Sequence, residues 1–539
     1  MRGTTKIRDA ALRELAEARA VFKKEVAAAP CPPVLSRIAV VLSGGGARGA
    51  YEAGALLAFQ DAQVPTHILA ATSVGSINAA DYAAHSTTLV GNAEPLVEGW
   101  AQITAPAMGI DWSRYVFILA GLIAASAGAG NFVREWMEEK DIFVHMNNPL
   151  LTWLALMFAG LMFLFLFDRI SYAFYVAANA LRGRHWVPDK KKAWISLIAN
   201  LFVWGFVLLF VSSAHVHLSR NEIVTFDENA SLVMVAAIPV VWVLWKLVRP
   251  WVSGWSHKFL RMPFRTGLFP NFERAKYLRR RIPEDGVRQS PMRILMTATD
   301  LESGAGRYFT NKSAEVLKKD PNAEAWFIDG ETQEAKDLVQ AAVASSAFTL
   351  AYEAVPMEGR LWTDGGIVTN QPIRPAVRLG ADVLFLVMLD PIDEDPHAAK
   401  PEIKTFLDVG VQATAILISK NLKTDLKQLD RVNKLCETYS AELGVRPEQV
   451  QLEIGAQSFR YVKAFPVCPS KPLAATALDF DGEITTPMIV QGYRDATVSV
   501  KQFFRYEAQR PASHSRQTVR LSAERPEGNY QAQEAGGGR

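Results

Sequence analysis

The stretch RIAVVLSGGGARG, residues 37–49, joins a short apolar run to a turn that is rich in glycine. The run RIAVVLS (37–43) is rich in Val and Ile, and short continuous runs of this kind are typical of strands buried in a parallel sheet. The glycines and small residues that follow predict a tight turn into a helix. A second run, HILAAT at 67–72, repeats this order, since it ends at Ser73 and leads into small residues. Two such units in succession predict an α/β fold with a mainly parallel central sheet.

The α/β pattern returns after residue 263. RILMTATD (293–300) and VLFLVML (383–389) have the composition of buried strands, and EAKDLVQAAVASSA (334–347) has the pattern of a helix. The expected organisation is a charged N-terminal helix at 1–34, the two parts of the α/β domain at 35–111 and 263–505, a helical insert at 112–262 between them, and a polar, disordered tail at 506–539.

The insert is far more apolar than its surroundings. LLTWLALMFAGLMFLFLF (150–167) and AWISLIANLFVWGFVLLFVSSA (193–214) contain no charged residue, and ASLVMVAAIPVVWVLW (230–245) is similar. Apolar runs of about 20 residues match the hydrocarbon thickness of a bilayer. The alternative is a set of helices buried in a large globular core. The run at 115–130 is shorter and richer in Ala and Gly, so both interpretations stay open for it.

An even number of crossings is required if both parts of the α/β domain lie on one side of a membrane. Basic residues gather in the loop 168–192 and after residue 246, whereas loops 131–148 and 215–230 carry few. Positive charge marks the cytoplasmic side. We therefore expect about four transmembrane helices, with the α/β domain on the cytoplasmic side of a bacterial inner membrane.

Composition narrows the function classes. The net charge of the 539 residues is +3, which gives no reason to expect a nucleic-acid partner. The three cysteines lie far apart and predict neither a disulfide framework nor a metal site. The N-terminus has no apolar segment of the signal-peptide type.

The glycine turn after the first strand has two interpretations. It contains the spacing G-x-G-x-x-G, which is typical of dinucleotide sites when an acidic residue follows about 20 positions later, at the end of the next strand. Here that strand ends at Thr72, and Asp61 lies in the preceding loop. Backbone amides at a helix N-terminus also stabilise a developing oxyanion. The residues of this candidate oxyanion site are Gly44, Gly45, Gly46, Arg48 and Gly49, of which Arg48 either holds the loop or faces an anionic headgroup.

Ser73 lies where a nucleophile is mounted in many hydrolases. A strand–nucleophile–helix elbow needs small residues two positions before and two after the nucleophile. Gly75 meets this requirement, and Ala71 departs from the usual glycine by one methyl group. The alternative is that Ser73 only caps the following helix, since serine is a favoured N-cap.

A base for Ser73 is not found among the nine histidines, because none lies in a context typical of a catalytic loop. The segment LWTDGG (361–366) offers another candidate. Asp364 precedes Gly365 and Gly366 in an expected turn after a short strand. Desolvation in an apolar cleft would raise the pKa of an aspartate toward a value useful for a base. Asp-Gly is also a common turn pair, so an ordinary turn is the alternative.

The order of SGGGARG, ATSVGS about 30 residues later and DGG far downstream resembles the patatin-like phospholipase family. The segments ATDLESGAGRYF (298–309) and AAVASSAFTLAYEAVPMEGRLWTDGGIVTNQPI (341–373) are similar to that family as well. The resemblance covers residues 35–111 and 263–500. Ala71 stands where the family usually has glycine, and Phe348-Thr349 where many members have proline.

The resemblance implies a three-layer α/β domain with a Ser-Asp dyad, no histidine, no metal and no cofactor. Ser73 would be the nucleophile and Asp364 the base, beside an oxyanion site built by the glycine turn. The expected function is a lipid acyl hydrolase that cleaves fatty-acyl esters of phospholipids or lysophospholipids at a membrane bilayer. An acyltransferase with the same dyad and a non-catalytic lipid-binding scaffold are the alternatives.

Overall fold

The computed structural model describes residues 5–28, 33–110, 267, 269–321, 323–324, 327, 330–349, 351–390, 406–454, 457–510 and 517–521. The chain divides into two compact units, and one of them combines Met1–Ile110 with Gly267–Arg539. Residues on either side of the expected insert therefore build one unit. The other unit, Asp111–Thr266, lies outside the described residues, and so do all the expected transmembrane runs.

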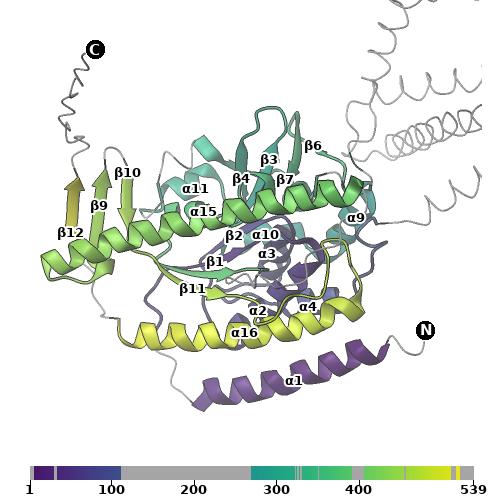
Figure 1. Ribbon diagram of the computed structural model, residues 1–539, viewed down its shortest axis with the longest axis horizontal. Helices are drawn as coiled ribbons and strands as arrows, with labels where there is room; N and C mark the ends of the chain where they lie inside the picture. Colours follow the sequence, from purple (N-terminus) through teal and green to yellow (C-terminus); the bar gives the residue numbers. More distant parts are fainter. Residues whose placement is uncertain are drawn as a thin grey trace, which may run out of the picture. The chain divides into compact units, whose positions relative to one another are not determined.

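A nine-stranded sheet forms the centre of the described unit (Figure 1). Its parallel part has the order β11-β8-β1-β2-β3, and this confirms the predicted α/β fold with a mainly parallel sheet. The bounds of these strands are β1 Ile38–Leu42, β2 Ile68–Thr72, β3 Arg293–Asp300, β8 Val383–Val387 and β11 Lys463–Val467.

Beyond β3 the sheet becomes mixed. β4 (Gly306–Thr310) and β7 (Arg360–Asp364) both pair antiparallel with β3, while β5 (Thr332–Glu334) and β6 (Val355–Met357) continue outward from them. The pairing of β7 with β3 sets Asp364 opposite Ala298. This register brings the carboxyl end of β7 to the region where β2 ends, because β2 and β3 are themselves neighbours.

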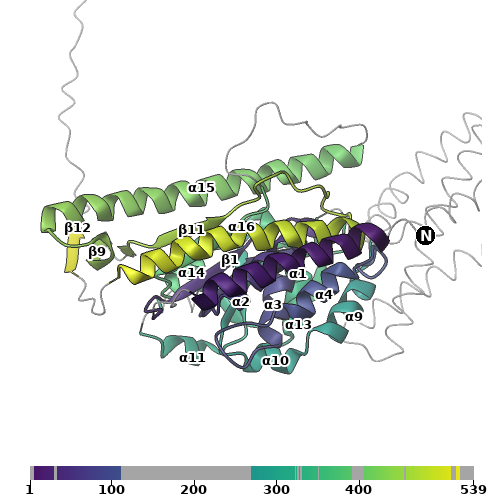
Figure 2. The same cartoon turned by 90° about the horizontal axis from the view of Figure 1, so that it is seen from below.

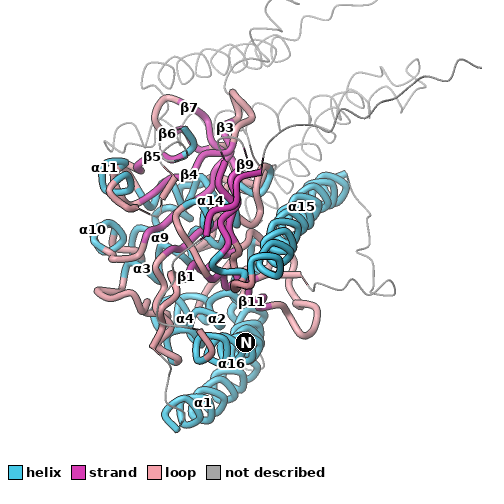
Figure 3. The backbone as a smooth tube through the Cα atoms, turned by 90° about the vertical axis from the view of Figure 1, so that its left-hand side faces the viewer, coloured by secondary structure: helices cyan, strands magenta, loops and turns pink. Residues whose placement is uncertain are grey.

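Helices cover both faces of the sheet (Figure 3). One face packs against α14 (Ile373–Arg378) and α15 (Phe406–Leu443) through a core of buried aliphatic residues from β1, β2, β3 and β8. The other face carries α3 (Val74–Ala84), α13 (Leu338–Ser345) and α16 (Gly482–Ala508). Further helices are α2 Ala50–Asp61, α4 Glu94–Ala101, α9 Asn271–Arg281, α10 Glu284–Gln289 and α11 Ala314–Lys318.

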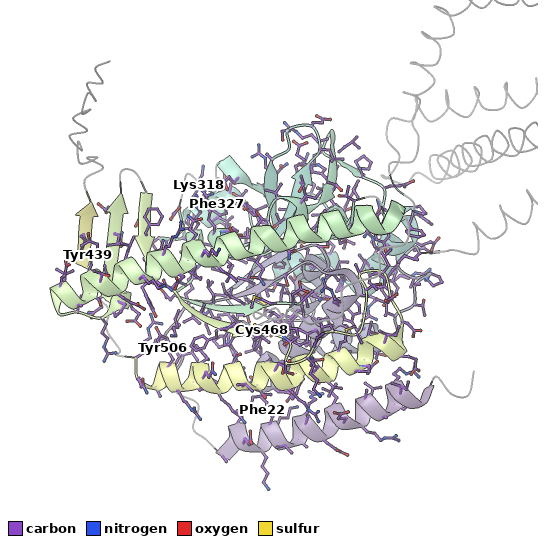
Figure 4. All side chains as sticks on the ribbon, viewed as in Figure 1. Phe22, Lys318, Phe327, Tyr439, Cys468 and Tyr506 are labelled. Atoms are coloured by element: carbon purple, nitrogen blue, oxygen red, sulfur yellow. The ribbon has the colours of Figure 1, made fainter. Side chains whose placement is uncertain are left out.

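The charged N-terminal helix is α1 (Thr5–Ala28), which lies along α16 (Figure 2). Phe22 points from α1 toward α16 and meets Tyr493 edge-on, with ring centroids 6.0 Å apart (Figure 4). The Arg19 guanidinium donates to both carboxylate oxygens of Asp61, at 2.8 and 2.9 Å. Asp61 is thus an anchor for the N-terminal helix, and it is not at the end of β2 where a dinucleotide site would need it.

A second, three-stranded sheet corrects the expectation of a wholly disordered tail. Residues Gln517–Leu521 form β12, which pairs parallel with β9 (Val450–Ile454), and β10 (Gln457–Arg460) completes the order β10-β9-β12. Val519 packs against a small core that includes Cys436 and Tyr439 of α15 (Figure 4). The polar composition of the tail hides this strand, in which only Val519 and Leu521 are apolar.

The two chain ends that flank residues 111–266 converge. A Cβ on Gly109 would lie 2.8 Å from the carbonyl oxygen of Pro270. The Tyr352 hydroxyl donates to the carbonyl of Met108 at 3.0 Å, and the Phe269 amide donates to the carbonyl of Ala351 at 2.7 Å. Adjacent ends are the arrangement in which a domain accepts a long insertion. Among the described helices, none combines the length and apolar character needed to cross a bilayer. The membrane crossings at 112–262 stay a prediction.

Candidate active site

Ser73 is held in a strained turn between β2 and α3. Its φ and ψ angles are 55° and −128°, a region that favours glycine over residues with a side chain. A Cβ on Gly75 would lie 2.8 Å from the Cβ of Leu42, so the turn has room only for glycine there. Ala71 is fully buried in β2 between Leu42 and Met296 of the neighbouring strands, and its methyl group is accommodated.

The side chain of Ser73 makes no capping bond to α3. Its hydroxyl instead donates to the carboxylate Oδ2 of Asp364 at 2.6 Å. Both side chains are buried, with 7% and 2% of their surface exposed. The Ser73 hydroxyl therefore bonds to Asp364 and does not cap the helix, contrary to the alternative interpretation.

Asp364 is fixed from the other side by its own turn. The Gly366 amide donates to Oδ1 at 2.7 Å, and Thr299 Oγ1 donates to the backbone carbonyl of Asp364 at 2.8 Å. A Cβ on Gly365 would lie 2.2 Å from the carbonyl oxygen of Thr297, so the first glycine of the turn is needed for close packing on β3. Oδ1 of Asp364 thus accepts a hydrogen bond from its own turn, and Oδ2 accepts one from Ser73.

Burial is the main influence on the acidity of Asp364. It raises the pKa of the carboxyl group to about 6, against the opposing effects of the hydrogen bonds from Ser73 and Gly366 and of the Arg274 charge. A carboxylate with a pKa near 6 is ionised at neutral pH and is a far stronger base than an exposed aspartate. The pair thus has the geometry and the basicity for proton transfer from a serine hydroxyl.

The glycine turn lies beside Ser73. A Cβ on Gly44 would lie 2.8 Å from the Cβ of Ser73, so the backbone of the loop approaches the hydroxyl closely. Gly46 has a φ of 60° and packs against the carbonyl of Ala477, which only glycine permits. Within the described residues, no hydrogen-bond partner is found for the amides of Gly45 and Gly46.

The structure gives other members of the predicted oxyanion set different partners. The Gly44 amide donates to Asn370 Oδ1 at 2.9 Å, so this amide is already occupied. The Arg48 guanidinium pairs with Asp390, with Nη1 and Oδ1 2.5 Å apart, and its Nε lies 3.5 Å from the carbonyl of Gly45. Arg48 thus holds the loop, which is one of its two predicted roles. The carbonyl of Gly49 accepts from Asn78 Nδ2 at 2.9 Å.

Several positioning residues were not found from the sequence. Asn370 joins the glycine turn to the aspartate turn, and Ser345 Oγ accepts the Ser73 amide at 2.9 Å. Behind the glycine turn, Glu52 accepts from the Ser43 amide and from Asn78 Nδ2, each at 2.8 Å. Burial raises the pKa of Glu52 to about 8, so this carboxyl group is largely neutral at pH 7 and does not oppose an anion in front of the loop. For Glu52, Asn78 and Ser345 the signal was a polar residue inside an otherwise apolar helix, whereas Asn370 lies in a loop and gave no such signal.

Histidine does not contact Ser73 in the described part of the chain. His67 accepts from the Ile38 amide, and His85 pairs with Asp81 and with the carbonyl of Arg281. Over the described residues, no group of three or more His, Cys, Asp or Glu side chains is arranged to hold a metal ion.

The fold is a mainly parallel α/β sheet. Its candidate site combines a serine at a strand–helix elbow, a buried aspartate and a glycine turn. These features place the chain in the class of α/β domains with a nucleophile elbow. The family model for patatin-like phospholipase matches residues 40–377. The chain belongs to the patatin-like phospholipase family, and at this level it is a lipid acyl hydrolase.

Curated proteins and solved structures give no further support for the family. No curated protein matches the chain. Among solved structures, the chain is similar to the crystal structure of VipD from Legionella pneumophila, with 12% sequence identity and a TM-score of 0.31, over 87% of this chain and 68% of that one. A likeness at this TM-score does not define a fold.

Proposed function

We propose that the protein cleaves fatty-acyl esters of phospholipids or lysophospholipids through Ser73 and Asp364. The observation that carries the proposal is the 2.6 Å hydrogen bond from the Ser73 hydroxyl to Asp364, in a buried site beside the glycine turn. Membership of the patatin-like phospholipase family supports the class of substrate.

In the proposed mechanism, Ser73 Oγ attacks the ester carbonyl carbon while its proton moves to Asp364 Oδ2. The amides of Gly45 and Gly46 face no other partner in the described chain and are the donors proposed for the oxyanion. Collapse of the tetrahedral intermediate returns the proton to the departing alcohol and leaves an acyl ester on Ser73. Asp364 then takes a proton from a water molecule, whose oxygen attacks the acyl carbonyl. As the bond between Ser73 Oγ and the acyl carbon breaks, Asp364 returns the proton to Ser73 and the fatty acid is released.

Labelling with a fluorophosphonate, followed by peptide mass analysis, tests this proposal. We expect the label on Ser73 in the wild-type protein and no label on a Ser73→Ala variant, because only an activated serine reacts readily with the reagent. A phospholipid or lysophospholipid substrate should slow labelling and yield a free fatty acid. Folded protein that is not labelled, or labelled elsewhere, would favour the scaffold interpretation. Transfer of the acyl group to a second lipid instead of water would favour the acyltransferase.

The rate of ester cleavage should fall at low pH as one group is protonated, which gives the pH profile a single acidic limb. Asp364 must be ionised to accept the proton, and burial raises its pKa to about 6. We therefore expect kcat/KM for a soluble short-chain ester to rise with pH and to level off above the pKa of Asp364. Measurement of kcat/KM between pH 4 and 8, with the fold checked by circular dichroism at each pH, gives the pKa of this acidic limb. A limb near the ordinary aspartate pKa would contradict the assignment of Asp364 as a buried base.

A further inference from the structure

One short segment, Ser345–Ala347 at the end of α13, is bonded to both members of the Ser73–Asp364 pair. The hydroxyl of Ser345 accepts the amide of Ser73 at 2.9 Å. The carbonyl of Ala347 accepts the amide of Asp364 at 3.1 Å, and it also accepts the hydroxyl of Thr363 at 3.0 Å. A shift of this segment would therefore change the distance between the two reacting side chains.

Arg274 of α9 holds the same segment from behind. Its Nη2 donates to the carbonyl of Val343 at 3.0 Å, and its Nη1 donates to the carbonyl of Ser346. These are carbonyls of the last turn of α13, where a cation also interacts favourably with the helix dipole. The Arg274 side chain is 1% exposed, so the contact is made in the interior of the protein.

The environment of Arg274 is unusual for a buried cation. The guanidinium carbon lies 3.9 Å from the ring centroid of Tyr352, and Nη2 also donates to Asn271 Oδ1. No ion pair between Arg274 and a carboxylate is found in the described part of the chain. A buried charge without an ion-pair partner is costly to fold around. The Arg274 charge acts on Asp364, where it opposes protonation of the carboxylate.

Most other charged groups on the described elements around Asp364 have ion-pair partners of their own. Helix α13 itself contains no charged residue. Ion pairs among the described residues of these and neighbouring elements include Asp300 with Arg360, Arg48 with Asp390, Arg293 with Asp320, Asp81 with His85 and Arg281, Glu273 with Lys276, and Arg279 with Asp337. Of the charged groups in the described residues, Arg274 is the one that influences the pKa of Asp364.

We propose that Arg274 is a positioning residue of the active site, which holds the Ser345–Ala347 segment in register and places its positive charge one residue from the carbonyl that accepts the Asp364 amide. The inference rests on the proposed function, because it assigns Arg274 to the reaction of Ser73 and Asp364. It differs from a purely structural role in one measurable way: the charge of Arg274, as well as its hydrogen bonds, affects the reaction.

Two substitutions separate these effects. Arg274→Lys keeps the charge but loses the planar fork that reaches two carbonyls, whereas Arg274→Gln keeps two N–H donors but loses the charge. We expect Arg274→Lys to lower kcat by about 10- to 100-fold through misplacement of the pair, with KM nearly unchanged and the acidic limb where it is in the wild type. Arg274→Gln should move the acidic limb of kcat/KM upward by a fraction of a pH unit, because the Arg274 charge influences the pKa of Asp364 less than burial and the hydrogen bonds from Ser73 and Gly366 do.

The matched control is Arg279→Met, on the same helix. Arg279 pairs with Asp337, the cap at the opposite end of α13, and 37% of its side chain is exposed. This variant removes a contact between α9 and α13 that does not reach Ser73 or Asp364. We expect it to keep the wild-type kcat and pH profile.

Fluorophosphonate labelling distinguishes failure of this inference from failure of the proposed function. If the wild-type protein is labelled at Ser73 but neither Arg274 variant changes kcat or the acidic limb, Arg274 has no positioning role. Equal losses of kcat in both folded variants with no movement of the limb would reduce Arg274 to a structural residue and overturn the proposal. A wild-type protein without label at Ser73 would remove the proposed function itself.

Discussion

Replacement of Ser73 by alanine is expected to lower kcat for ester cleavage by about 10⁴-fold or more, because the proposed mechanism has no other nucleophile. Replacement by glycine should abolish activity to the same extent. The two variants should differ in stability, since Ser73 has a φ of 55° and a ψ of −128°. Glycine adopts such angles without strain, and we expect Ser73→Gly to be about 1 kcal/mol more stable than Ser73→Ala in urea unfolding.

A control for this experiment is Ser346→Ala. Ser346 lies within the Ser345–Ala347 segment and its carbonyl accepts from Arg274, but its hydroxyl bonds only to carbonyls within α13, at 2.7 and 3.3 Å. It should keep most of the activity. Residual ester cleavage by Ser73→Ala at more than a few per cent of the wild-type rate would mean that another group attacks the ester. Equal stability of the glycine and alanine variants would mean that the strained turn relaxes in the alanine protein.

The sequence was sufficient for the fold class and for the three turns of the candidate site. Continuous apolar runs identified β1, β2, β3 and β8, because strands buried on both faces leave that pattern. Glycine at positions 75 and 365 was also readable, since each turn brings backbone against backbone. These features are local, and local steric requirements determine which residues occur at such positions.

The side chains that hydrogen-bond to these turns could not be predicted from the sequence. Asn370 occupies the amide of Gly44, although the two residues are 326 positions apart. Arg48 and Asp390 pair across a similar separation, and Arg274 reaches the site from a helix whose sequence is mostly charged. Such contacts depend on how the sheet brings distant segments together. Neither periodicity nor turn chemistry predicts that arrangement.

The candidate site combines backbone strain with buried charge. Ser73 has a disfavoured backbone conformation, Asp364 is a buried carboxyl group, and Arg274 is a buried guanidinium with no ion pair in the described chain. Each feature lowers the stability of the folded state. Substitutions that remove the strain or the buried carboxylate should therefore stabilise the protein while they remove activity, and Asp364 offers the sharpest case.

Replacement of Asp364 by asparagine is expected to lower kcat by about 10⁴-fold and, at alkaline pH, to stabilise the fold. Burial raises the pKa of Asp364 from its ordinary 3.8 to about 6, so the folded state favours the protonated carboxyl group. The contribution of this group to stability is full below its ordinary pKa and is lost as the pH rises through about 6. Asparagine is neutral throughout, so the variant should gain up to about 3 kcal/mol over the wild type at pH 8 and little at pH 4.

Asp61 is the matched control for this prediction, because its pKa is shifted in the opposite direction. The pKa of Asp61 is lowered; burial, which would raise it, is outweighed by the bonds from Arg19 and Lys23. Its contribution to stability is present above the ordinary aspartate pKa and is lost as the pH falls through the lowered value. Asp61→Asn should therefore destabilise the protein at pH 8, whereas Asp364→Asn stabilises it. Urea unfolding of both variants at pH 4, 6 and 8 measures the two signs, and destabilisation by Asp364→Asn at pH 8 would show that the buried carboxylate is not a burden on the folded state.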